Sequence, residues 1–166
     1  MPSVKVQAYL DRVLAGASED EFLAEFPHPV LVELEGQEDD AGAGALTERL
    51  DSQAIRLQSK SSRDANVFAL PEGEVRVGRV SDADVRVEHK SVSKAHARFH
   101  VRAGAIELVD LDSTNGTYLN GRRLAPREAV RVRPDDTVRF GLATGFYVFD
   151  AAGFYQYLTT LSRFGF

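Results

Sequence analysis

Between about residues 53 and 150 the sequence alternates short apolar runs with turn-forming residues, and this pattern constrains the fold more than any other feature. In one run, Ala97, Phe99 and Val101 alternate with Arg98 and His100. Because successive side chains of a strand point to opposite faces, such alternation predicts half-buried strands. Strands are predicted at residues 67–70, 74–77, 85–87, 95–101, 105–111, 130–132, 137–140 and 146–149. Many short strands separated by turns indicate an all-β sandwich of two antiparallel sheets.

Both ends of the chain carry helical periodicity instead. Apolar residues at positions 6, 9, 10, 13 and 14 predict a helix over 3–15. Ser18 and Glu21 have the spacing of a capping box before a second helix over 18–26, which Pro27 ends. Apolar residues at 154, 157, 158 and 161 predict an amphipathic C-terminal helix. These helices either pack on the sandwich and enlarge its core, or offer a docking surface to a partner.

Four segments follow from these patterns. Residues 1–34 form an N-terminal extension with two short helices and a candidate strand over 30–34. Residues 35–52 are acidic and rich in small residues, which predicts a flexible linker. Residues 53–150 form the sandwich, and residues 151–166 the C-terminal helix.

Composition excludes several classes of function. Residues 1–50 carry three basic and eleven acidic side chains, and the remainder carries seventeen basic and fourteen acidic ones. This mild excess of positive charge is far from the basic surface of a nucleic-acid-binding protein, so we expect no nucleic-acid partner. The chain has no cysteine and no long apolar run. We therefore expect a cytoplasmic protein with no disulfide and no membrane contact.

Three clusters of polar residues and glycine lie between predicted strands, where side chains and backbone are free to meet a ligand. They read GR at residues 78–79, SVSKAH at 91–96 and LDSTNGTYLNG at 111–121. Each cluster borders a predicted strand, so the three can gather at one end of the sandwich. Their joint occurrence is much more specific than any one of them alone.

Together the clusters resemble the signature of the forkhead-associated (FHA) family, in which GR, SxxH and STNGT followed by NG occur in this order. The resemblance covers roughly residues 65–150 and implies an FHA-type β-sandwich that binds phosphothreonine peptides. The residues predicted to bind the phosphopeptide are Arg79, Ser93, Lys94, Thr114 and Asn115. The residues predicted to shape the loops are Gly78, His96, Gly116 and Asn120, the last mainly through a hairpin turn at Asn120-Gly121.

The chemistry of these residue types suits a phosphothreonine, which carries about −1.5 to −2 charges and three acceptor oxygens. Arg79 offers a planar fork of donors, Ser93 a short hydroxyl donor and Lys94 a compact charge where the family often has Arg or Asn. The resemblance implies that the Asn115 amide hydrogen-bonds the peptide backbone. It also implies an apolar notch for the threonine methyl group, whose burial is worth on the order of 0.8 kcal/mol.

Other interpretations compete with these. Ser, Asn and Gly are common turn formers, so the same loops also have a purely structural interpretation, and both can hold. His96 and His100 lack further ligands for a metal, and Asp110 and Asp112 have no accompanying nucleophile or phosphate cradle. We therefore expect no catalytic residue, no metal and no cofactor.

The sequence predicts a non-catalytic adaptor that binds a phosphothreonine-containing partner downstream of a Ser/Thr kinase. The alternative is a phosphate-independent scaffold or assembly protein that uses the same fold and the terminal helices for protein contacts. A weaker hypothesis is that Thr47, once phosphorylated, folds back onto Arg79 and Ser93. The stretches expected to read the third residue after the phosphothreonine, near Ser91 and over 141–145, have no obvious charged side chain for that role.

Overall fold

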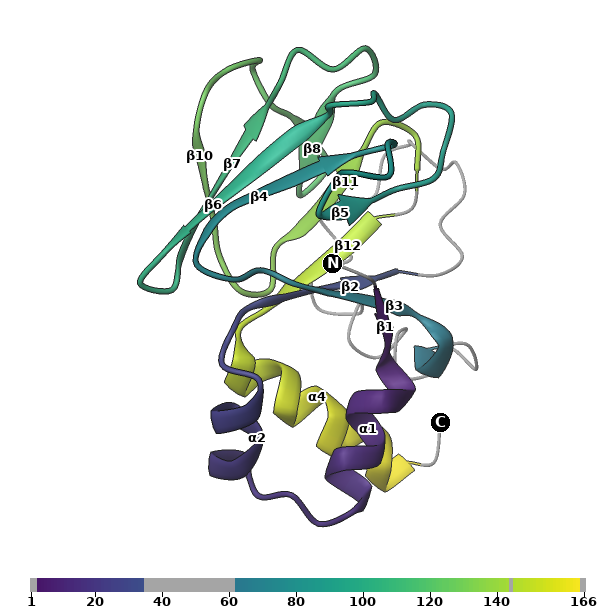
Figure 1. Cartoon of the computed structure of the whole chain (residues 1–166), viewed down its shortest axis with the longest axis vertical. Coiled ribbons are helices and arrows are strands. Elements are labelled where there is room, and N and C mark those ends of the chain that lie inside the picture. Colours follow the sequence, from purple (N-terminus) through teal and green to yellow (C-terminus); the bar gives the residue numbers. More distant parts are fainter. Residues whose placement is uncertain (1–2, 35–61, 144, 165–166) are drawn as a thin grey trace.

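The structure, a computed structural model, describes residues 3–34, 62–143 and 145–164. Two β-sheets face each other, and three helices pack together at one end of the molecule (Figure 1). The helical elements are α1 (Val6–Leu14), α2 (Glu19–Glu25), the 3-10 turn η1 (Ser62–Asp64) and α4 (Ala151–Phe164). The strands are β1 (Val4–Lys5), β2 (Val30–Glu33), β3 (Asn66–Ala69), β4 (Gly73–Gly78), β5 (Val85–Arg86), β6 (Ala97–Arg102), β7 (Ala105–Asp110), β8 (Thr117–Leu119), β9 (Arg122–Arg123), β10 (Val130–Val132), β11 (Thr137–Phe140) and β12 (Gly145–Phe149).

The two sheets form the predicted sandwich. The seven-stranded sheet has the order β1-β3-β2-β12-β11-β8-β9, and the five-stranded sheet has the order β10-β7-β6-β4-β5. Neighbouring strands are antiparallel except for β4 and β5, which are parallel. The predicted fold class is therefore confirmed, and the expectation of purely antiparallel sheets is wrong for this one pair.

The alternating pattern that predicted the sandwich also builds its core. Ala97, Phe99 and Val101 of β6 are buried, whereas Arg98 and His100 stay partly exposed on the other face. The ring of Phe99 packs edge-on against Phe140 of the opposite sheet, with centroids 6.2 Å apart. Burial of one face of each strand between the sheets therefore fixes the register of the central strands.

The candidate strand near residue 30 is an interior strand of the seven-stranded sheet. β2 lies between β3 and β12, with Val32 opposite Val67 on one side and Tyr147 on the other. Val30, Leu31 and Val32 are all buried. Consecutive residues are buried because the sandwich core covers one face of β2 and the helices cover the other.

The helices build a second apolar cluster on the outer face of this sheet. Tyr9 of α1 contacts the rings of Phe26 and Phe154, with centroids 4.9 and 5.1 Å away. Phe22 of α2 is 1% exposed and packs in the same cluster. The sheet contributes residues of β2, β3 and β12 to it. The helices thus enlarge the core, which is the first of the two uses weighed from the sequence.

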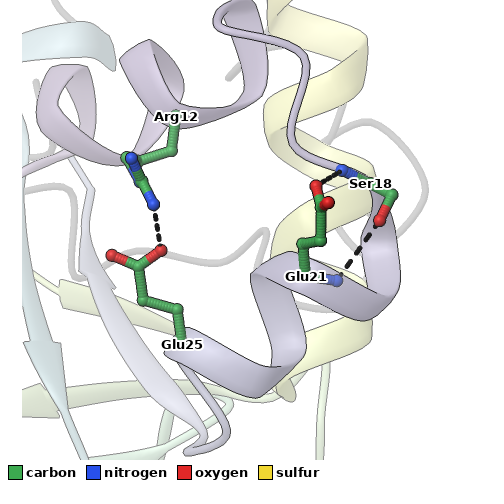
Figure 2. Close-up of polar contacts among 4 residues, drawn as sticks. All are labelled: Arg12, Ser18, Glu21 and Glu25. Carbon is green, nitrogen blue, oxygen red and sulfur yellow. Dashed lines mark hydrogen bonds and ion pairs between the residues drawn. The ribbon is translucent and has the colours of Figure 1, made fainter.

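The predicted capping box is present at the start of α2. The Ser18 hydroxyl accepts from the Glu21 N–H at 3.3 Å, and the Ser18 N–H donates to the Glu21 carboxylate at 2.9 Å (Figure 2). An ion pair between Arg12 and Glu25 joins α1 to α2. The capping box thus defines the start of α2, and the ion pair links α2 to α1 beside the aromatic cluster.

The start of α1 differs from its prediction for an identifiable reason. α1 begins at Val6 instead of residue 3, because Val4 and Lys5 pair with β3. α4 begins at Ala151, ahead of its apolar stripe, where the Asp150 carboxylate accepts from the Gly153 N–H at 2.7 Å. Leu14, expected on the buried stripe of α1, is 56% exposed.

Some predictions fall outside the described residues, namely the acidic linker over 35–52 and Thr47 within it. Within the described ranges, no helix is both long and apolar enough to cross a membrane. In the same part of the chain, no three His, Asp or Glu side chains are grouped so as to hold a metal ion.

Candidate functional site

The three sequence clusters meet at one end of the sandwich, and Ser93 joins them. The Ser93 carbonyl accepts from the Arg79 N–H at 3.1 Å, which ties the loop after β4 to the loop after β5. The Ser93 hydroxyl oxygen accepts from the Thr114 N–H at 3.1 Å, which adds the loop after β7. Residues from three separate loops are therefore held beside one another.

Arg79 is an exposed residue with one of its side-chain donors bound to a neighbouring loop. Its Nε donates to the Val92 carbonyl at 3.0 Å, and this contact orients the side chain along the neighbouring loop. In the described part of the chain, neither Nη atom of Arg79 has a hydrogen-bond partner. The outer edge of the fork is thus available to an anion.

Ser93 and Lys94 add donors next to Arg79. The Ser93 oxygen already accepts a hydrogen bond from Thr114, so its own proton remains available to an acceptor outside the protein. Lys94 follows directly and is exposed, as is Thr114. The predicted binding residues are thus placed together, with their spare donors on the surface.

Asn115 faces partly inward. One N–H of its side-chain amide donates to the Ser91 carbonyl at 2.8 Å, which links the loop after β7 to the loop after β5. The amide oxygen and the second N–H remain for a ligand, since Asn115 is only half-buried. The predicted contact with a peptide backbone stays a prediction, and the structure adds a supporting role for the same side chain.

His96 is buried beneath these loops and supports two of them through hydrogen bonds. Its Nδ1 accepts from the Ser93 N–H at 3.0 Å, and its Nε2 contacts the Gly116 carbonyl at 2.9 Å. Because Nδ1 accepts, the ring proton lies on Nε2, which donates to Gly116. Burial lowers the pKa of His96, opposed by the Gly116 hydrogen bond and the charge of Asp110. A neutral imidazole therefore positions the loops.

Asp110 organises the loop that bears Thr114 and Asn115. Its buried carboxylate accepts from the Ser113 hydroxyl at 2.5 Å, from the Ser113 N–H at 3.2 Å and from the Thr117 hydroxyl at 2.7 Å. Sequence reasoning considered Asp110 only as half of an acid pair. Its position at the end of a strand, three residues before Ser113, suits an aspartate whose side chain accepts hydrogen bonds from the following loop.

Ser91 is a second supporting residue that the motifs did not identify. Its hydroxyl contacts His89 Nδ1 at 2.6 Å and accepts from the Leu142 N–H at 2.8 Å. Its carbonyl holds Asn115, as described above. Ser91 thus connects the loop after β11 to the rest of the site, a contact between residues 51 positions apart that no local pattern reveals.

Two glycines allow close approaches of the backbone. A Cβ on Gly78 would lie 2.0 Å from the Lys94 carbonyl oxygen. Gly116 has a φ of +87°, and its carbonyl accepts from both His96 and the Gly141 N–H. Asn120 and Gly121 both have positive φ between β8 and β9, the hairpin geometry that the Asn-Gly pair predicts.

Comparison with known proteins gives three findings. A family model described as FHA domain matches residues 75–141, which contain all three clusters. The chain is 31% identical over 117 residues to an oxoglutarate dehydrogenase inhibitor of Corynebacterium glutamicum, covering 70% of this chain and 80% of that protein. It is 38% identical over 73 residues to the human nuclear inhibitor of protein phosphatase 1, covering 42% of this chain and 21% of that protein.

The fold agrees with these similarities. The crystal structure of the FHA domain of CT664 protein from Chlamydia trachomatis superposes with a TM-score of 0.53 and 22% identity, over 74% of this chain and 97% of that one. The GR, SxxH and STNGT clusters lie within the matched span and converge on Ser93, and the corynebacterial relative aligns over four-fifths of its length. The chain therefore belongs to the FHA domain family.

Proposed function

We propose that this protein is a non-catalytic adaptor of the cytoplasm that binds a phosphothreonine segment of a partner protein, downstream of a Ser/Thr kinase. The observation that carries this proposal is the set of spare donors around Ser93. The Nη atoms of Arg79, the hydroxyl proton of Ser93 and the ammonium of Lys94 all belong to adjoining residues at the surface. The Nε of Arg79 and the hydroxyl oxygen of Ser93 already have partners in the neighbouring loops.

A phosphate group suits this donor set better than a neutral ligand does. It brings about −1.5 to −2 charges and three acceptor oxygens, which matches two cations and a hydroxyl. Charge-assisted hydrogen bonds are roughly twice as strong as neutral ones. Because the loops hold Arg79 and Ser93 in place before binding, little conformational entropy is lost when the phosphate arrives.

Thr114 and Asn115 supply the peptide side of the site in this proposal. Thr114 is exposed beside Ser93, and Asn115 keeps an amide oxygen and one N–H for the backbone of the bound segment. Such contacts fix the direction of the peptide but add no charge. The phosphate then provides affinity, and Asn115 provides register.

The names of two relatives support a binding role over a catalytic one. Both the corynebacterial and the human protein are named as inhibitors of enzymes. The chain covers 80% of the corynebacterial protein and 21% of the human one. That the present chain also inhibits an enzyme is a separate proposal. Self-binding through phosphorylated Thr47 stays a prediction.

A titration with paired peptide libraries tests the proposal. A degenerate phosphothreonine library should bind, and its unphosphorylated twin should bind far more weakly. Arg79→Ala should weaken phosphopeptide binding by about 1.5–3 kcal/mol or more, the worth of a hydrogen bond to a charged group. Arg102→Ala is the matched control, because Arg102 is exposed at the end of β6. Equal binding of the two libraries would favour the phosphate-independent scaffold.

A further inference from the structure

Within the described residues, the helices cover only part of the width of the outer face of the seven-stranded sheet. The helices pack against residues of β2, β3 and β12. No residue of β11, β8 or β9 belongs to this helix-covered cluster, as far as the described residues extend. β8 begins directly after Gly116, so the open part of the face borders the loop that bears Thr114 and Asn115.

Three side chains cross this open face in one row. Arg139 of β11 pairs with Tyr118 of β8, and Tyr118 pairs with Arg123 of β9. Residues directly opposite in antiparallel strands share a face. The Arg139 guanidinium lies over the Tyr118 ring, with Cζ 4.4 Å from the ring centroid. We call Arg139, Tyr118 and Arg123 the arginine row.

The positive charge of this row is not balanced. Within the described part of the chain, neither Arg123 nor Arg139 has a carboxylate within ion-pair distance, whereas nearby Arg127 pairs with Asp112 at 3.1 Å. The Nε atom of Arg139 is buried and has no hydrogen-bond acceptor. Strands lie about 4.8 Å apart, so the backbones of Arg139 and Arg123 are roughly 10 Å apart across β8. Two carboxylates of one extended peptide, one for each arginine, would balance their charge.

The row is continuous with the candidate site. A Cβ on Gly116 would lie 2.7 Å from Arg123 Nε and 3.1 Å from Cζ, so this guanidinium rests on the backbone next to Asn115. A peptide anchored at Arg79 and Ser93 that passes Asn115 therefore reaches Arg123 next, and Arg139 beyond it.

We propose that Arg123 and Arg139 bind the carboxylates of Asp or Glu residues that flank the phosphothreonine in the partner protein. This inference rests on the proposed function, because the phosphate anchors the peptide that the row then selects. A peptide fits better than a nucleic acid, since two arginines release too few counterions for nucleic-acid affinity. Asp135 and Asp136 precede β11 at its far end and would repel a longer polyanion.

A set of four peptides tests the proposal. They share one sequence except that the central residue is phosphothreonine or threonine and the flanking residues are Glu or Gln. The full chain should bind the phosphorylated Glu peptide about 2- to 25-fold more tightly than the phosphorylated Gln peptide, as expected for one exposed and one half-buried ion pair. The double variant Arg123→Gln/Arg139→Gln should bring this ratio close to one and keep its preference for phosphothreonine. Arg131→Gln, exposed on β10 of the other sheet, should leave the ratio unchanged.

Because Arg139 is half-buried, the thermal stability of the double variant should be measured as a control for folding. The single variant Arg123→Gln, at an exposed residue, should by itself lower the ratio. A wild-type ratio near one, or a ratio that survives in the double variant, would overturn the inference. Equal binding of the phosphorylated and unphosphorylated peptides would instead overturn the proposed function. In that case the unphosphorylated Glu and Gln peptides still report on the arginine row.

Discussion

The backbone N–H of Ser93 donates to Nδ1 of His96 at 3.0 Å, so a buried imidazole holds the serine proposed to meet the phosphate. Through Nε2 the same ring holds Gly116, which follows Asn115. Its ring also lies edge-on to Phe140, with centroids 5.7 Å apart. His96 therefore couples two loops of the site to the core, and only its neutral form can do so.

This arrangement predicts a loss of stability in mild acid. Burial lowers the pKa of His96 from its ordinary value of 6.5. Below that pH the unfolded chain takes up a proton that the folded chain does not. The unfolded state then binds more protons, so the free energy of unfolding falls by up to about 1.4 kcal/mol per pH unit until the folded ring also titrates. Urea unfolding at pH 7.5, 6.5 and 5.5 measures this slope.

The histidine ring itself provides the decisive measurement. In NMR titrations, the midpoint of the His96 ring in the folded protein should lie below its ordinary value of 6.5, and the variant His100→Gln should retain this behaviour. A His96 midpoint at or above 6.5 would contradict the prediction.

Asp110→Asn should destabilise the protein and weaken phosphopeptide binding together. The carboxylate accepts from two hydroxyl groups and one N–H, and an amide cannot accept all three. We expect a loss of about 2 kcal/mol of unfolding free energy. Asp112→Asn is the control, because its exposed ion pair with Arg127 is worth less than about 1 kcal/mol. Equal losses in the two variants would contradict a specific role for Asp110.

Gly78→Ala should be among the most damaging small substitutions in the chain. Its Cβ would lie 2.0 Å from the carbonyl oxygen of Lys94, and the clash is with backbone that cannot rotate away. The loop bearing Ser93 would have to move, so both unfolding free energy and phosphopeptide affinity should fall. Gly145→Ala meets only ordinary contacts at 3.5 and 3.6 Å and is the matched control. Similar thermal stability of the two variants would refute this.

Phe22→Ala should separate stability from binding. Phe22 is 1% exposed in the helical cluster, so its truncation should cost about 3–5 kcal/mol. Leu14→Ala, at a side chain 56% exposed, should stay within about 0.5 kcal/mol of the wild type. At temperatures where both variants are folded, phosphopeptide affinity should match that of the wild type. A lower affinity of folded Phe22→Ala would show that the helices take part in recognition.

The sandwich was predictable because its long strands alternate apolar and polar residues over four or more positions, as in β6. β8 and β9 were not among the predicted strands, since three and two residues are too few to show a period. The parallel pairing of β4 with β5 and the place of β2 in the sheet depend on partners distant in sequence. Local patterns do not encode such partners.

For the candidate site, the sequence predicted the binding residues but not all of the residues that support them. The motifs identified Arg79, Ser93 and Asn115, and the structure brings these residues together. Sequence reasoning named Ser91 and Asp110 but missed their supporting roles, because these depend on hydrogen bonds to other loop residues that no motif specifies. The amide of Asn115 was expected to face a ligand, yet one of its N–H groups is used within the protein.

The interior position of β2 also bears on how the chain acquires its structure during synthesis. Residues 30–33 emerge more than a hundred residues before their partners in β12. Pairings this distant in sequence make folding slow. Until β12 has been synthesised, β2 lacks this partner strand, and its three consecutive apolar residues can associate with other chains. The carbonyl of Gly116 likewise gains its partner only after Gly141 has been synthesised, so the loop end of the sandwich is completed after the strands of the five-stranded sheet.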